Sequence, residues 1–117
     1  MKKILVIEDE PATLANLILM LEMEGLRPLA ASNGRQGVKM AKDELPDVIL
    51  CDVSMPELDG HGVLECLRAD PATVSIPFIF LTAKSDKKDL RTGMNLGADA
   101  YLTKPASAEA ESRECLE

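Results

Sequence analysis

The chain has 117 residues, 46% of them hydrophobic, and a net charge of −7. This length supplies one hydrophobic core but not two, so we expect a single domain over residues 1–117. The negative charge argues against direct nucleic-acid binding, and no apolar run approaches the ~20 residues that cross a membrane. Three cysteines without Cys-x-x-Cys spacing disfavour a disulfide framework or a zinc site. We therefore expect a globular, cytoplasmic domain.

The first half of the chain alternates short apolar runs with helical patterns. Residues 4–7 form a β-branched strand that ends on acidic residues, and Pro11 suits the first turn of the helix that follows. That helix has apolar residues at i, i+3, i+4 and i+7, and Gly25 can end it. Residues 26–31 should form an edge strand because a proline interrupts them. A second helix is expected to end at about Glu44.

The second half continues the alternation. A buried strand at residues 48–51 ends abruptly on Asp52, and Pro56 prevents it from continuing. Gly60 allows a tight turn into the next helix, which should end near Asp70. Such repeated alternation of strands and helices favours a parallel sheet with helices on both faces. The remaining expected elements are a strand at 76–81, a helix at 86–96, a strand at 100–103 and a polar helix from 106 to 117.

Polar side chains follow four of the expected strands, at the points where the strands end. They are Glu8 and Asp9, Asp52, Thr82 and Lys104. Because parallel strands place their carboxyl ends on one edge of the sheet, these residues should converge where open α/β sheets bind ligands. Three carboxylates packed together repel, and a hard divalent cation such as Mg²⁺ fits best among them. Lys104 would add a fixed positive charge.

Carboxylates, a metal ion, a lysine and a hydroxyl together suit phosphoryl transfer. Asp52 can act as the nucleophile and form an aspartyl phosphate. Mg²⁺ and Lys104 would neutralise charge on the equatorial oxygens while the bond shifts, and Thr82 could hydrogen-bond one phosphoryl oxygen. The residues expected to carry the chemistry are therefore Asp52, Thr82 and Lys104.

Four stretches of the chain also carry a family resemblance. They are VIEDE at 6–10, DVSMPELDG at 52–60, LTAK at 81–84 and GADAYLTKP at 97–105. Any one of them is weak evidence, but the four in this order and spacing are specific. The chain resembles, over nearly its whole length, the receiver domain of two-component response regulators. The resemblance implies a flavodoxin-like doubly wound α/β fold, with a five-stranded parallel sheet in the order 2-1-3-4-5 and helices on both faces.

The resemblance also implies a metal site. Asp52 matches the phosphoacceptor aspartate, and Glu8 and Asp9 match the acidic pair that binds Mg²⁺. Glu8 stands where the family often has an aspartate, and its longer side chain favours a place in the outer coordination shell of the metal. Asp9 is therefore the preferred direct ligand. Ser54 matches the position whose backbone carbonyl completes the metal site.

Other positions match the residues that respond to phosphorylation. Thr82 and Lys104 match the pair that grips the phosphoryl group, and Lys104-Pro105 matches a bond that is usually cis in the family. Tyr101 matches the aromatic switch residue, which turns inward when the threonine moves toward the phosphate. Ala106 stands where the family often has a bulky aromatic residue, and the expected last helix is short and polar, so this chain departs from the family at the usual output and dimer face.

The implied function is a phosphorylation-dependent signalling switch. A sensor histidine kinase or a phosphotransfer protein would donate the phosphoryl group, and an output domain or target protein would read the changed surface. The domain would assist its own phosphorylation and dephosphorylation without turning over an external substrate, so we do not expect an enzyme in the usual sense. The resemblance also allows a homodimer to form on phosphorylation. The thin apolar content of the last helix favours a domain cut from a longer protein.

Other functions remain open at this level. A carboxylate-nucleophile phosphatase typically wants a second acid two residues after the nucleophile, where this chain has Ser54. A flavodoxin-like cofactor binder would need a phosphate loop after the first strand, where acidic residues would repel a phosphate. A phosphorylation-independent interaction module with a vestigial acidic pocket would lack metal binding. The acids at residues 8–10 could also simply cap the first helix.

Overall fold

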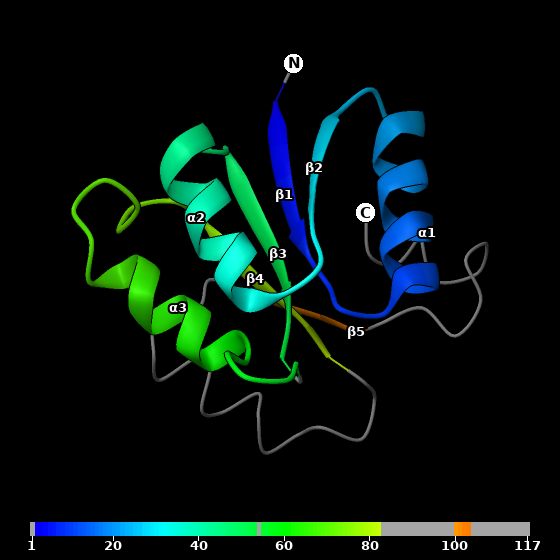
Figure 1. Cartoon of the computed structure of the whole chain (residues 1–117). Helices are drawn as coiled ribbons and strands as arrows, with labels where there is room; N and C mark the ends of the chain where they lie inside the picture. Colours follow the sequence, from blue (N-terminus) through cyan, green and yellow to red (C-terminus); the bar gives the residue numbers. More distant parts are fainter. Residues whose placement is uncertain (1, 54, 83–99, 104–117) are drawn as a thin grey trace.

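A five-stranded parallel sheet forms the centre of the molecule (Figure 1). The computed structural model describes residues 2–53, 55–82 and 100–103, the last four and Thr82 by their backbone alone. The strand order is β2-β1-β3-β4-β5, which confirms the expected flavodoxin-like order. The strands are β1 (Lys3–Ile7), β2 (Arg27–Ala31), β3 (Val48–Asp52), β4 (Phe78–Thr82) and β5 (Ala100–Thr103).

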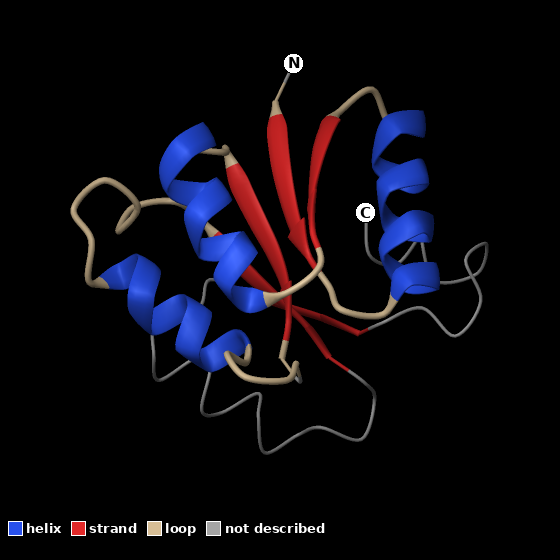
Figure 2. Ribbon diagram, viewed as in Figure 1, coloured by secondary structure: helices blue, strands red, loops and turns tan. Residues whose placement is uncertain are grey.

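Helices cover both faces of this sheet, as expected (Figure 2). Helix α1 lies on one face, and α2 and α3 lie side by side on the other. None of the helices that the structure describes is long and apolar enough to span a membrane. The expected helices at 86–96 and 106–117 lie outside the described residues. The described helices are α1 (Pro11–Met23), α2 (Gly34–Glu44) and α3 (Gly60–Arg68).

The central strands supply apolar side chains to two separate cores. Along β1, Leu5 and Ile7 join the core beneath α2 and α3, whereas Ile4 and Val6 join the core beneath α1. This division follows from the strand period of two, which sends successive side chains to opposite faces. Because both faces are covered, the strand reads as a continuous apolar run rather than as an alternation.

The ends of the first two helices follow the expected local chemistry. The side chain of Glu10 caps α1 by accepting a hydrogen bond from the backbone N–H of Ala12, 3.0 Å away, and Pro11 is the first helical residue. After this helix, Gly25 takes the left-handed backbone conformation (φ +80°). Asn33 caps α2 in the same way as Glu10 caps α1.

Strand β4 begins two residues later than the sequence predicts. Ile76 belongs to the preceding turn, because its N–H donates to the carbonyl of Thr73 and its own carbonyl accepts from Nη1 of Arg68 at 2.8 Å. The next residue is Pro77, which has no N–H to offer a sheet. The strand therefore starts at Phe78.

The turn between β3 and α3 is built differently from the sequence expectation. The left-handed backbone conformation falls on Glu57 (φ 66°), and Gly60 is the first residue of α3. The N–H of Gly60 donates to the carbonyl of Val53 at 2.8 Å. A Cβ at Gly60 would meet the carbonyl oxygen of Asp52 and would lie 2.8 Å from the ring of Phe80. Gly60 is needed here because its backbone lies close to Asp52 and Phe80, whereas the left-handed conformation of the turn falls on Glu57.

This contact predicts that Gly60→Ala destabilises the fold. The added methyl group meets the backbone at Asp52, which cannot move as freely as a side chain, so we expect the free energy of unfolding to fall by about 1–3 kcal/mol. Urea unfolding followed by circular dichroism measures this change.

Gly62→Ala is the matched control, because it makes the same change in the same helical turn. Its Cβ would lie 2.6 Å from Cδ1 of Leu58, the end of a side chain that can rotate away. We expect Gly62→Ala to lose clearly less stability than Gly60→Ala. Equal losses from both variants would contradict the role assigned to Gly60.

Candidate metal centre at the carboxyl edge of the sheet

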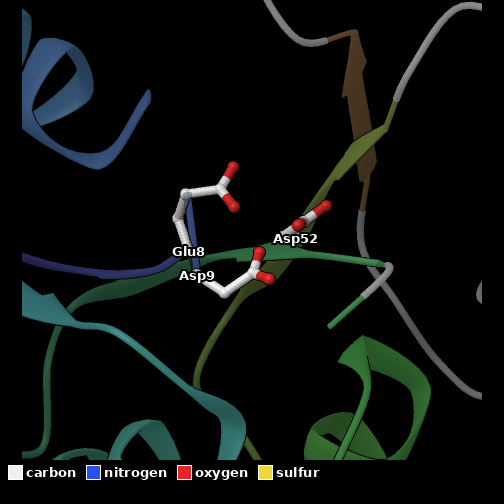
Figure 3. A group of neighbouring side chains, drawn as sticks. All are labelled: Glu8, Asp9 and Asp52. Atoms are coloured by element: carbon white, nitrogen blue, oxygen red, sulfur yellow. The ribbon is translucent and has the colours of Figure 1, made fainter. Parts of the chain in front are cut away.

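Three carboxylates meet at the carboxyl ends of β1 and β3 (Figure 3). Asp52 is the last residue of β3, and Glu8 and Asp9 directly follow β1. One oxygen from each of the three side chains lies within 4.8 Å of the others. The structure thus brings together the three acids that the sequence expects at this edge.

The register of the sheet positions these acids. Strands β1 and β3 are parallel neighbours with Ile7 opposite Cys51, so the residues that follow these two, Glu8 and Asp52, stand at the same level. The N–H of Glu8 donates to the carbonyl of Ala31 at 3.0 Å, which extends the pairing of β1 with β2 by one residue. The backbone that carries the acids is therefore held as part of the sheet.

The acids differ in their exposure to water. Glu8 is 0% exposed and Asp52 is 3% exposed, whereas Asp9 is half-buried. At an effective dielectric constant of about 20, two ionised carboxylates this close repel by roughly 3 kcal/mol, and by less where Asp9 reaches water. A cation between the carboxylates would convert this repulsion into attraction.

The donor set fits Mg²⁺. This ion prefers oxygen ligands at 2.0–2.1 Å in an octahedron, so opposite ligand oxygens lie about 4 Å apart. The 4.8 Å span of the three oxygens is close to that distance, and small side-chain rotations would close the difference. Mg²⁺ commonly takes one or two carboxylates and keeps several waters. Half-buried Asp9 together with Asp52 can supply this pair.

Glu10, the third acid of the run, has a separate role. Its side chain caps α1, and its N–H donates to Oε2 of Glu8 at 3.2 Å. Helix capping therefore explains Glu10 alone among the three acids at residues 8–10. Glu8 and Asp9 belong to the cluster with Asp52.

The other expected site residues are placed only in part. In the pairing of β3 with β4, Asp52 lies opposite Leu81, so the backbone of Thr82 stands one residue beyond that partner. The backbone of Tyr101 pairs with Phe80 across β4 and β5. The remaining expected site residues, Ser54, Lys104 and Pro105, lie outside the described residues, and so does the expected cis bond.

Several residues around the acids were not singled out from the sequence. The ring of Phe80 lies beside Gly60, and the ring of His61 packs edge-on against Phe80, with centroids 5.2 Å apart. Gly34, the first residue of α2, touches Leu58 in the loop that follows Asp52. These contacts join segments that are distant in sequence, so no local sequence pattern predicts them.

Comparison with known proteins places the chain among receiver domains. The family model described as the response regulator receiver domain matches residues 4–113. Protein PilH of Pseudomonas aeruginosa is 41% identical over 109 residues, which cover 93% of this chain and 90% of PilH. The alkaline phosphatase synthesis transcriptional regulatory protein PhoP of Bacillus subtilis is 42% identical over 106 residues, which cover 91% of this chain and 43% of PhoP. The chain thus spans less than half of PhoP.

A solved structure adds information on the metal. The receiver domain of the sensor histidine kinase PA1611 from Pseudomonas aeruginosa PAO1 has a magnesium ion coordinated in its active-site cleft. It is 32% identical to this chain with a TM-score of 0.85, and the match covers 98% of this chain and 93% of that one. On the match of residues 4–113 and the likeness to PilH, the chain belongs to the family of response regulator receiver domains.

Proposed function

We propose that this receiver domain is a signalling switch that is phosphorylated on Asp52 with the help of Mg²⁺. The observation that carries the proposal is the convergence of Glu8, Asp9 and Asp52 at one edge of the sheet. The magnesium ion in the cleft of the PA1611 receiver domain supports the choice of cation. By the resemblance, the donor is a phosphohistidine on a sensor kinase or a phosphotransfer protein in the cytoplasm.

In the proposed reaction, a carboxylate oxygen of Asp52 attacks the phosphorus atom of the donor. A P–O bond to Asp52 forms while the P–N bond to the donor histidine breaks, and the histidine leaves with the electron pair. Mg²⁺, when bound, would neutralise the charge that spreads over the phosphoryl oxygens. The burial of Asp52 at the sheet edge would restrict the directions from which its carboxylate can react and would limit the access of water.

The remaining residues of the proposed site complete the switch. Thr82 would hydrogen-bond the phosphoryl group, and Lys104 would balance its charge. Movement of Thr82 toward the phosphate would let Tyr101 turn inward, and an output domain or target protein would read the altered surface. Ser54 would contribute its backbone carbonyl to the metal, and Pro105 would follow Lys104 through a cis bond. The domain would assist its own phosphorylation and dephosphorylation.

Asp52→Asn should abolish phosphorylation. Incubation of the wild-type protein with acetyl phosphate and Mg²⁺ should give one phosphoryl adduct in intact-mass spectrometry. The adduct should require Mg²⁺ and be absent from Asp52→Asn, because an amide cannot act as the nucleophile.

Asp59→Asn is the control for this experiment, because it makes the same change in the same loop. Asp59 is exposed and caps α3 through Oδ1, a role that asparagine can also fill. This variant should keep the adduct. A wild-type protein that stays unmodified even by a cognate phosphodonor would instead support a phosphorylation-independent interaction module with a vestigial pocket.

Asp9→Asn should raise the stability of the metal-free protein and lower its stabilisation by Mg²⁺, because it removes both a repelling charge and a metal ligand. In the absence of Mg²⁺, removing one of three clustered charges should raise the free energy of unfolding by about 1–2 kcal/mol. Mg²⁺ at ten times its Kd should stabilise the wild type by about 1.4 kcal/mol and Asp9→Asn by much less. Thermal and urea unfolding with and without Mg²⁺ measure both effects.

Asp43→Asn removes the same charge from an exposed position on α2, away from the acids. It should change neither the metal-free stability nor the response to Mg²⁺ appreciably. If Asp9→Asn behaved like this control, the acids would not form a metal site.

A further inference from the structure

We propose that Gly34 is a positioning residue for the metal and phosphoryl site, and that it acts through the loop between β3 and α3. Gly34 is the first residue of α2, and the described residues of this loop are 53 and 55–59. The inference rests on the proposed function of Asp52 and adds to it a residue that lies outside the acidic cluster.

Gly34 is buried in direct contact with the loop. A Cβ at this position would meet the carbonyl oxygen of Leu58 and would lie 3.0 Å from both Cβ of Leu58 and Cγ2 of Val63. The first of these neighbours is a backbone atom, so rotation of a side chain cannot relieve the overlap. Any side chain at position 34 must therefore displace either the loop or the start of α2.

The loop is fixed at its other contacts. At its base, Gly60 packs against the carbonyl of Asp52 and donates its N–H to Val53. Val53 and Met55 are 4% and 8% exposed and belong to the core beneath α2 and α3. A loop held at its base and in the core has little freedom to absorb a displacement at Leu58, so that displacement should be transmitted to Asp52.

Among the described residues, Gly34 packs closely against the loop from the start of α2. Figure 1 shows the amino-terminal end of α2 beside the chain that enters α3. A second tie, between Nε of Arg35 and Oε2 of Glu57 at 3.9 Å, joins two side chains that are 79% and 75% exposed. Such an exposed ion pair contributes little to holding a backbone. The closely packed Gly34 is therefore the residue expected to fix the loop.

The expected consequence of Gly34→Ala is weaker binding of Mg²⁺. Residues that hydrogen-bond to metal ligands typically change metal affinity by about 10- to 100-fold when they are altered, and displacement of the loop that follows Asp52 should act on the same scale. We therefore expect Gly34→Ala to raise the Kd for Mg²⁺ by roughly 10-fold or more. Phosphorylation by acetyl phosphate at a fixed, low Mg²⁺ concentration should slow in parallel, and high Mg²⁺ should recover part of the rate.

Gly37→Ala is the matched control, one turn further along α2. The three atoms nearest to its Cβ would all belong to the side chain of Ile7 in the core. Both variants should lower the thermal midpoint, but only Gly34→Ala should shift the Kd for Mg²⁺ measured by isothermal titration calorimetry on the full chain. A purely structural role for Gly34 would change the midpoint alone.

A second variant keeps the test valid if Gly34→Ala does not fold. Leu58→Ala inserts no atoms and removes the side chain that lies between Gly34 and Gly62, so it should loosen the loop and also weaken Mg²⁺ binding. Wild-type Mg²⁺ affinity in the folded Gly34→Ala variant, or a shift no larger than that of Gly37→Ala, would overturn the inference. If Gly34→Ala does not fold, unchanged Mg²⁺ affinity in Leu58→Ala would overturn the inference in the same way.

Failure of the wild-type protein to bind Mg²⁺ would instead overturn the proposed function itself.

Discussion

The mutual repulsion of three carboxylates is the constraint on which the functional edge of this domain depends. Glu8 and Asp52 are buried, and Asp9 is half-buried beside them, with oxygens within 4.8 Å of one another. An isolated chain would separate such charges, but the parallel pairing of β1 with β3 holds their backbones at one level. The free energy of sheet and core formation thus offsets the repulsion. A bound cation would relieve the repulsion, and that relief would contribute to the affinity of the site for the cation.

The two-sided core explains why the edge can stay rigid under this repulsion. Alternate residues of β1 enter different cores, so the strand is held from both faces and cannot tilt toward either helix layer. On the α3 side, Gly60 lies directly against the carbonyl of Asp52, with the ring of Phe80 next to it. The backbone of the proposed nucleophile is therefore closely packed on the α3 side.

Much of this arrangement can be predicted from the sequence, because it depends on local pattern and general topological rules. The apolar run at 48–51 and the acid that ends it follow from composition alone, and the convergence of the strand ends follows from a parallel sheet. Contacts between distant segments could not be predicted. The side chain of Arg68 binds the carbonyl of Ile76 just before β4, and Gly34 packs against Leu58 in the loop after Asp52. The contact at Gly34 joins segments that no window of neighbouring residues contains.

The balance of charge at the edge indicates why a lysine is expected in addition to a metal ion. Glu8, Asp9 and Asp52 carry up to three negative charges, and the adjacent start of α1, whose N–H at Glu10 donates to Glu8, supplies about half a positive charge. A divalent cation would then leave the edge close to neutral. An incoming phosphoryl group brings further negative charge, which this near-neutral edge cannot balance. A fixed cation close to the phosphoryl oxygens would meet that need, and this is the role that the sequence motif assigns to Lys104.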